Sequence, residues 1–123
     1  MTNKNNISSS DILNNVVIEG MKNIKANEIV SLNLKEIETA VCDYFIICQG
    51  DVPPHVKAIA EEVEHLVKKT HKENAFHKEG YENLEWVVLD YFDIIIHVFN
   101  KEKRGFFNLE GLWSDAKLTI YEE

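Results

Sequence analysis

Hydrophobic positions recur at helical spacing in two stretches of this chain. The first predicts an amphipathic helix over residues 10–25, and the serines before it offer several N-cap residues. The second predicts a helix over residues 53–70, and Pro53 suits its first turn because an N–H group there has no helical partner. Gly20 costs the first helix about 1 kcal/mol relative to alanine, which a close packing contact would explain. The apolar stripes consist of Leu13, Val16, Val17, Met21 and Ile24, and of Val56, Ile59, Ala60, Val63, Leu66 and Val67.

Runs of β-forming residues predict strands at residues 28–34, 43–48, 86–90 and 94–99. A short extended piece is predicted near residues 75–78, and residues 117–121 are a candidate final strand. An aromatic-rich helix is predicted between Arg104 and Trp113. The order helix, strand, strand, helix, strand, strand, helix predicts an α+β domain with a small mixed β-sheet and flanking helices.

Residues 86–99, WVVLDYFDIIIHVF, are almost continuously apolar and predict a β-hairpin. A two- or four-residue loop centred on Phe92 and Asp93 places six side chains on a face that packs against the helices: Val87, Leu89, Tyr91, Ile94, Ile96 and Val98. The opposite face, called the hairpin face below, carries Trp86, Val88, Asp90, Ile95, His97 and Phe99. Aromatic anchors mixed with a few oriented polar groups are typical of a protein interface. A loop of odd length would mix the two faces.

The polar residues of the hairpin face also have a structural interpretation. His97 suits a core histidine with satisfied hydrogen bonds, and Asp90 suits a carboxylate that belongs to the turn. A catalytic role for the pair is disfavoured, because no nucleophile stands at a plausible spacing and no third group would orient a base. The sequence leaves the structural and the interface interpretations open.

The turn after Gly50 does not suit a nucleotide. It has one glycine, Pro53 and Pro54 remove two N–H donors where an anion would need them, and Asp51 adds repulsion. The segment matches neither a Walker-type loop nor a dinucleotide fingerprint. No cofactor is therefore expected.

Composition and length are those of one soluble globular domain. Of 123 residues, 45% are hydrophobic and 28% are charged, and no apolar run approaches the roughly 20 residues of a membrane span. Residues 1–7 are expected to be a disordered tail, and residues 8–123 a single domain. Because the N-terminus has no apolar core of a secretory signal, the cytoplasm is the simplest location.

The net charge of −8 points to a basic protein partner. Domains that grip nucleic acids cluster Lys and Arg, whereas the densest basic stretch here, residues 101–104, is interrupted by Glu102. Direct nucleic-acid binding is therefore disfavoured. Cys42 and Cys48 lie six residues apart on what looks like one strand, and we expect two reduced thiols rather than a disulfide or metal ligands.

The motifs of this chain resemble the Iojap family, the ribosomal silencing factors. The matching runs are DYFIIC at 43–48 with Gly50, VKAIA at 56–60, EGY at 79–81, WVVLDY at 86–91, DIIIHVF at 93–99, and Arg104 with LEGLW at 109–113. The resemblance implies a nucleotidyltransferase-like fold that lacks the catalytic carboxylates of that superfamily, and hence no enzyme activity. It also implies binding to ribosomal protein L fourteen on the large subunit. There a member sterically blocks joining with the small subunit and so represses translation when nutrients are scarce.

Carried over by position, the resemblance also implies a docking surface. Its residues are Glu79, Gly80, Tyr81, Trp86, Asp90, Tyr91, Asp93 and His97, with Phe99 and Arg104 as supporting candidates. Two places depart from the family pattern. Residues 51–55 replace small polar residues and a glutamine, and Phe92 replaces the usual glycine of the hairpin turn, although phenylalanine adopts a positive φ poorly. An exposed Phe92 would itself serve as an anchor.

Two other functions stay open at this point. A nucleotidyl-transfer enzyme follows from the implied fold alone, and an acidic adaptor for a partner other than the ribosome follows from the charge. Self-association is not settled either. An apolar hairpin face that lacks a partner can pair with itself, so a weak homodimer is an open expectation.

Overall fold

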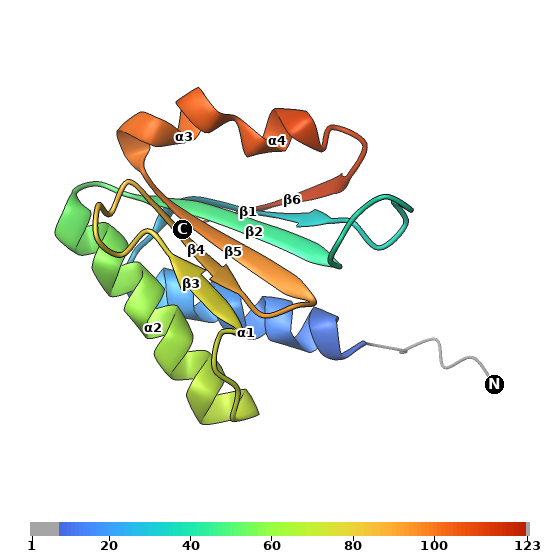
Figure 1. Ribbon diagram of the computed structural model, residues 1–123, viewed down its shortest axis with the longest axis horizontal. Helices are drawn as coiled ribbons and strands as arrows, with labels where there is room; N and C mark the ends of the chain where they lie inside the picture. The colour runs from blue at the N-terminus through green and yellow to red at the C-terminus, as the bar shows by residue number, and fades with distance from the viewer. Residues whose placement is uncertain (1–7, 123) are drawn as a thin grey trace.

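A single six-stranded sheet with helices on both of its faces organises the chain (Figure 1). The structure is a computed structural model that describes residues 8–122, apart from the side chain of Phe106, so the predicted tail at residues 1–7 lies outside the described residues. The helices are α1 (Ser9–Asn23), α2 (Pro53–His71), α3 (Lys101–Phe107) and α4 (Leu109–Leu112). The strands are β1 (Asn27–Asn33), β2 (Tyr44–Gly50), β3 (His77–Glu79), β4 (Trp86–Asp90), β5 (Ile94–Asn100) and β6 (Lys117–Tyr121).

The sheet is mixed, as predicted, and runs in the order β3-β4-β5-β2-β1-β6. β2 and β5 pair in parallel, whereas the other neighbouring strands pair antiparallel. The predicted element order was incomplete, because β3 and β6 both join the sheet as its edge strands and the last helix is two short helices that meet at Asn108. The α+β class is confirmed.

Helices α1 and α2 pack closely on one face of the sheet. Ser8 caps α1 and forms a capping box with Asp11, and α2 begins at Pro53 as predicted. A Cβ atom at Gly20 would lie 3.3 Å from both Cα and Cγ2 of Val63, so this glycine allows the two helices to approach each other. The predicted packing contact is confirmed.

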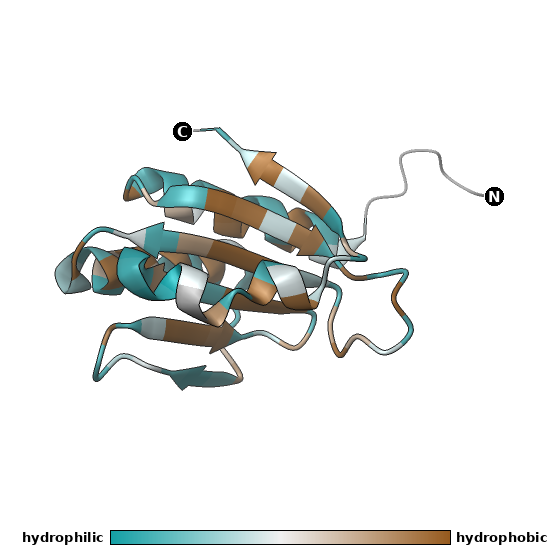
Figure 2. Cartoon of the chain, turned by 90° about the horizontal axis from the view of Figure 1, so that it is seen from above, coloured by the Kyte–Doolittle hydropathy of each residue, from teal (hydrophilic) through white to brown (hydrophobic). Residues whose placement is uncertain are grey.

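Each face of the sheet carries its own apolar core. Val17, Met21, Ile46, Ile59 and Ile96 are among the buried residues between the sheet and α1 and α2. Leu32, Leu34, Phe45, Ile47 and Phe99 are among those on the α3–α4 side. Seen from that side in Figure 2, brown hydrophobic bands run along the central strands, whereas the edge strand β3 is teal. The sheet is therefore apolar in its middle and polar at its β3 edge.

The two cysteines do not share a strand, so that expectation was wrong. Cys42 precedes β2, which begins only at Tyr44, and packs in the α3–α4 side core, whereas Cys48 lies within β2 and faces the opposite core. Both are buried and free. Burial raises the pKa of Cys42 to about 11 and that of Cys48 to about 12, so both thiols stay protonated at neutral pH.

A polar cluster joins the start of α1 to the strands. The carboxylate of Asp11 forms an ion pair with Lys35 and accepts hydrogen bonds from the hydroxyl of Tyr44 (2.6 Å) and the backbone N–H of Ser8 (3.1 Å). Ser10 donates to the carboxylate of Asp43 at 2.8 Å. The hydrogen bond from Lys35, followed by that from Tyr44, holds the pKa of Asp11 well below its usual range.

Replacing Asp11 with asparagine should lower the free energy of unfolding at pH 7 by about 1–2 kcal/mol. Because the folded pKa is depressed, this contribution is present above the pKa of the unfolded chain, about 4, and is lost as the pH falls below it. Denaturant unfolding of both proteins at neutral pH and at about pH 3 measures the difference, which should shrink in acid. Glu19→Gln on the exposed face of α1 is the matched control, and an equal difference at both pH values would contradict the electrostatic origin.

Candidate functional site

The β4–β5 hairpin has the predicted register. Val87 lies opposite Val98, Leu89 lies opposite Ile96, and the N–H of Tyr91 donates to the carbonyl of Ile94 at 2.9 Å. A two-residue loop of Phe92 and Asp93 therefore closes the hairpin. The six side chains expected against the helices are all buried there: Val87, Leu89, Tyr91, Ile94, Ile96 and Val98.

The opposite face is covered over one half, and here the sequence-based expectation was incomplete. His97 is 5% exposed and Phe99 is fully buried, because Phe107 and Trp113 pack over this part of the sheet. Phe99 stacks on Phe107 with ring centroids 5.9 Å apart. The short helices α3 and α4 thus turn the β5 half of the hairpin face into a second core. His97 is a core histidine, as the structural interpretation expected, but its hydrogen bonds are not all satisfied, because Nε2 has no partner among the described residues.

Trp86 borders the covered half and is held in place by His97. Its indole N–H donates to Nδ1 of His97 at 3.0 Å, and its ring lies 4.5 Å from that of Phe107. Burial lowers the pKa of His97 to about 4, so the ring is neutral at pH 7 and carries its proton on Nε2. Trp86, only half-buried, is therefore a rigid aromatic group whose rim reaches solvent.

The β4 half of the hairpin face stays open. Val88, Asp90 and Ile95 are half-buried, and the pairing of β3 with β4 places His77 beside Asp90 and Glu79 beside Val88. Side chains of paired residues share a face, so one surface combines these groups. We call it the open strip and define it as Trp86, Val88, Asp90, Ile95, His77 and Glu79. It is an apolar band with carboxylates at its edge.

The eight residues expected to form the docking surface are split by the fold. Trp86, Asp90 and Glu79 meet in the open strip, and Gly80 follows Glu79 at its edge. The others lie elsewhere: Tyr81 and Tyr91 pack on the α1–α2 side, His97 is buried, and Asp93 stands exposed at the hairpin tip.

The two tyrosines serve the fold rather than the open strip. The hydroxyl of Tyr81 donates to the carboxylate of Glu64 on α2, which also pairs with Lys78 at 3.1 Å. Tyr91 is 5% exposed, and its hydroxyl has no hydrogen-bond partner among the described residues. Burial raises the pKa of both phenols. Neither side chain is available to a partner that docks on the hairpin face.

The sequence did not single out Phe76 or His77. Phe76 lies just before β3 and is 66% exposed, and its ring lies 4.2 Å from that of Phe92, which is 63% exposed. The short extended piece predicted near residues 75–78 was the available signal, but its partner strand was not. Arg104 is buried, bonds to the β1 and β2 end of the sheet, and supports the fold away from the open strip.

The turn between β2 and α2 is stabilised by hydrogen bonds of the His55 side chain. The N–H of Asp51 donates to Nδ1 of His55 at 3.0 Å, and Nε2 of His55 donates to the carbonyl of Ile24 at 2.7 Å. A hollow of about 720 Å³ beside it is lined by Lys22, Ile24, Lys25, Ala26, Asn27, Asp51 and His55. Since the N–H of Asp51 is already used, the turn offers little to a phosphate.

Within residues 8–122, no group of three or more His, Cys, Asp or Glu side chains is arranged to hold a metal ion. Over the same residues, none of the helices combines the length and the apolar character needed to cross a membrane.

Comparison with known proteins assigns a family to this arrangement. A family model described as "Ribosomal silencing factor during starvation" matches residues 7–123. A ribosomal silencing factor RsfS of Halalkalibacterium halodurans is 37% identical over 119 residues, which are 94% of this chain and 97% of that protein. The RsfS of Bacillus subtilis is 39% identical over 98 residues, 77% of this chain and 79% of that one.

Solved structures agree with this assignment. A crystal structure of a protein from Chromobacterium violaceum superposes with a TM-score of 0.82 at 27% identity, covering 94% of this chain and 95% of that one. A second, from Bacillus halodurans, has a TM-score of 0.74 at 33% identity and covers 91% and 98%. Because a family model matches residues 7–123 and a relative at 37% identity covers 94% of the chain, this protein belongs to the family of ribosomal silencing factors.

Proposed function

We propose that this chain silences ribosomes by docking its open strip on ribosomal protein L fourteen of the large subunit. The bound chain then blocks joining of the small subunit sterically. Membership of the family makes the chain a ribosomal silencing factor; the partner protein, the surface and the steric mechanism are the proposal. The cytoplasm, where ribosomal subunits join, is the location that this proposal implies.

The observation that carries the proposal is the open half of the hairpin face. Trp86 is oriented by His97 and packed on Phe107, so little side-chain freedom remains to be lost on binding. Half-buried Val88 and Ile95 add apolar area, and Asp90 and Glu79 add negative charge. Aromatic anchors surrounded by apolar and oriented polar groups dominate protein interfaces energetically.

Charge supports a basic partner. The chain carries −8, and a ribosomal protein that lies among RNA phosphates is commonly rich in Lys and Arg. An acidic protein approaches such a surface quickly and is repelled by exposed phosphates elsewhere on the subunit. The acidic groups of the chain thus favour docking on a basic protein and disfavour binding to RNA.

The proposal includes no chemical step. Asp90 has one carboxylate oxygen engaged with the N–H of Phe92 at 2.8 Å, and His97 is buried in its neutral form, so the two do not form an acid–base pair in a cleft. In the turn after Gly50, the N–H of Asp51 already donates a hydrogen bond to His55, so it is not available to a phosphate. Tight calorimetric binding of ATP with Mg²⁺ would contradict this and favour a nucleotidyl-transfer enzyme.

Trp86→Ala and Asp90→Arg should each weaken binding to purified large subunits by about tenfold or more. Trp86→Ala removes the aromatic anchor, and Asp90→Arg places a cation where a basic partner approaches. Co-sedimentation at moderate salt measures the affinity, and a subunit-joining assay measures the block. The far-UV circular dichroism spectra of both variants should match that of the wild type. Trp86→Phe, which keeps an aromatic ring at this position, is a second variant that checks that lost binding does not reflect unfolding.

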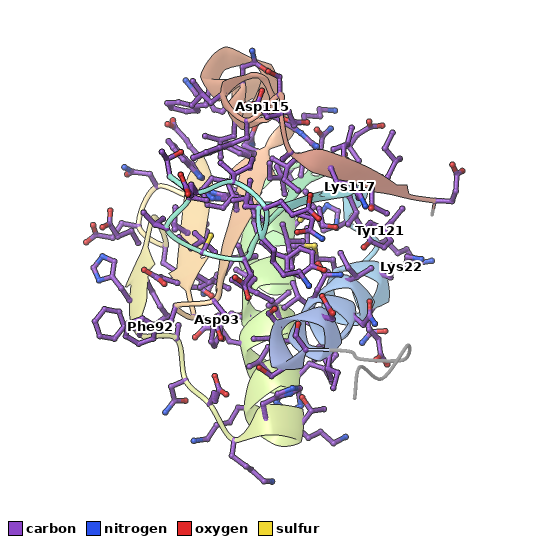
Figure 3. The ribbon with its side chains drawn as sticks, turned by 90° about the vertical axis from the view of Figure 1, so that its right-hand side faces the viewer. Lys22, Phe92, Asp93, Asp115, Lys117 and Tyr121 are labelled. Carbon is purple, nitrogen blue, oxygen red and sulfur yellow. The ribbon has the colours of Figure 1, made fainter. Side chains whose placement is uncertain are left out.

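Asp115→Arg is the matched control, because it makes the same charge change in the turn before β6 (Figure 3). It should bind like the wild type. If Trp86→Ala and Asp90→Arg bind at full strength, the open strip is the wrong surface. If the wild-type chain does not bind large subunits, the result would favour the alternative that the chain is an acidic adaptor for another partner. Self-association stays a prediction, which sedimentation of the chain alone checks.

A further inference from the structure

Phe92 adopts a backbone conformation that a phenylalanine rarely tolerates. Its φ is +71°, and the N–H of Asp93 donates to the carbonyl of Tyr91 at 2.8 Å, so a three-residue turn is centred on Phe92. Such a turn with positive φ is rare and strained, and for a bulky side chain this region costs on the order of 1–3 kcal/mol. Glycine would adopt it without penalty. The turn itself therefore gives no reason for a phenyl ring at this position.

The ring of Phe92 is nonetheless held in a defined place outside the core. It lies 4.2 Å from the ring of Phe76 at an interplanar angle of 39°. The N–H of Phe76 donates to the carbonyl of Asp90 at 2.7 Å, and the N–H of Phe92 donates to the carboxylate of the same residue, so Asp90 fixes both backbones. We call Phe76 and Phe92 the aromatic pair. About two-thirds of each residue is exposed, at 66% and 63%.

The charges around the aromatic pair select the occupant. Asp93 is exposed beside Phe92 at the tip of the hairpin, as Figure 3 shows, and the carboxylate of Asp90 lies just behind it. On the strand that follows Phe76, Lys78 is paired with Glu64 at 3.1 Å and His77 with Glu79 at 2.6 Å. Exposed aromatic faces next to a carboxylate suit a guanidinium group, which stacks on the rings and pairs with the acid. A second copy of this chain would bring the same carboxylates and is disfavoured.

We propose that the aromatic pair, together with Asp93, receives an arginine side chain of the basic ribosomal protein on which the open strip docks. This inference rests on the proposed function. Asp90 belongs to the open strip, and its carboxylate accepts the N–H of Phe92, so the aromatic pair lies next to that surface at the hairpin tip.

The test is Phe92→Gly, whose two effects have opposite signs. Relief of the positive φ should raise the melting temperature, whereas loss of the ring should weaken binding to purified large subunits by about fivefold or more. Phe76→Ala should weaken binding similarly. Asp93→Asn should weaken it at low salt and less at high salt, because screening reduces the ionic contribution. If the ring of Phe92 served only the fold, Phe92→Gly would instead lower the melting temperature and leave binding unchanged.

Ile120→Ala is the matched control, since Ile120 is also an exposed apolar residue (66%) but lies on β6 at the opposite edge of the sheet. It should bind within about twofold of the wild type. Full-strength binding of Phe92→Gly and Phe76→Ala, with Trp86→Ala still impaired, overturns this inference and leaves the proposed function standing. Loss of binding in both Trp86→Ala and Phe92→Gly supports the proposed function and this inference. If the wild type forms a dimer that Phe92→Gly dissociates, the occupant is a second copy and the inference is wrong.

Discussion

Replacing Arg104 with alanine should lower the free energy of unfolding by about 3–4 kcal/mol. Arg104 is 8% exposed and donates to the carbonyl of Glu28, to the side-chain oxygen of Gln49 (3.4 Å) and to the carboxylate of Glu110 (2.9 Å). Glu28 has φ +53° and lies where β1 shifts register against β2. Its carbonyl would lose the guanidinium as a hydrogen-bond partner, and the carboxylate of Glu110 would lose its cation.

The loss of Arg104 should also loosen the cover of the hairpin face. The guanidinium ties α4, through Glu110, to the β1 and β2 end of the sheet. Unfolding in guanidinium chloride followed by tryptophan fluorescence measures both effects, because Trp86 and Trp113 both pack against the core on this side of the sheet. A red-shifted native spectrum together with a melting temperature lower by roughly 10 °C is expected.

Two variants control this result. Lys101→Ala removes an exposed cation from the same helix and should change stability by less than about 0.5 kcal/mol. Arg104→Lys keeps the charge but lacks the planar fork, so it should fall between wild type and alanine. Wild-type stability in Arg104→Ala would mean that the three contacts contribute nothing measurable, and the account of the α3–α4 cover would fail with them.

Periodicity predicted the elements that bury a complete apolar stripe or face. Helices α1 and α2 carry unbroken stripes, and the two-residue loop at Phe92 makes the register of β4 and β5 readable, because only an even loop separates the apolar from the mixed face. The edge strands were only suggested. β3 has three exposed residues, HKE, and their pairing with β4 rests on backbone hydrogen bonds that leave no hydrophobic pattern.

The sequence brought only part of the candidate site together. Of the eight expected residues, Trp86, Asp90 and Glu79 meet on one surface, but nothing in the pattern of β5 indicates that α3 and α4 fold back over His97 and Phe99. That cover depends on ring contacts between segments that are distant in sequence, such as Phe45 with Trp113 at 6.0 Å. Such contacts are set by tertiary structure, which periodicity does not report.

The cover has a consequence for recognition. A fully open hairpin face would expose His97 and Phe99 beside Trp86, a large apolar area that favours aggregation or self-pairing. With α3 and α4 in place, the exposed part narrows to a strip bordered by Asp90 and Glu79. Under the proposed function, this strip offers apolar area to the partner, and its carboxylates favour a basic partner.

Gly80→Ala should be the most damaging small substitution at the edge of the open strip, with a loss of about 3 kcal/mol in unfolding free energy. Gly80 has φ +96°, a region that side chains with a Cβ avoid. A Cβ atom there would lie 2.0 Å from the carbonyl oxygen of Trp86 and 3.0 Å from Cα of Val87. Both neighbours are backbone atoms at the start of β4, so the clash is relieved only if the strand or the turn moves.

Because that movement displaces Trp86, binding to large subunits should fall together with stability in Gly80→Ala. Thermal melting and co-sedimentation measure the two effects on the same preparation. Gly105→Ala is the matched control, since a Cβ atom on this residue of α3 meets no atom within 4 Å and alanine favours a helix by up to about 1 kcal/mol. It should be neutral or stabilising and should bind like the wild type. Equal stability of the two variants would mean that the turn at Gly80 yields freely, and Trp86 would then lack the rigid support on which its role as an anchor depends.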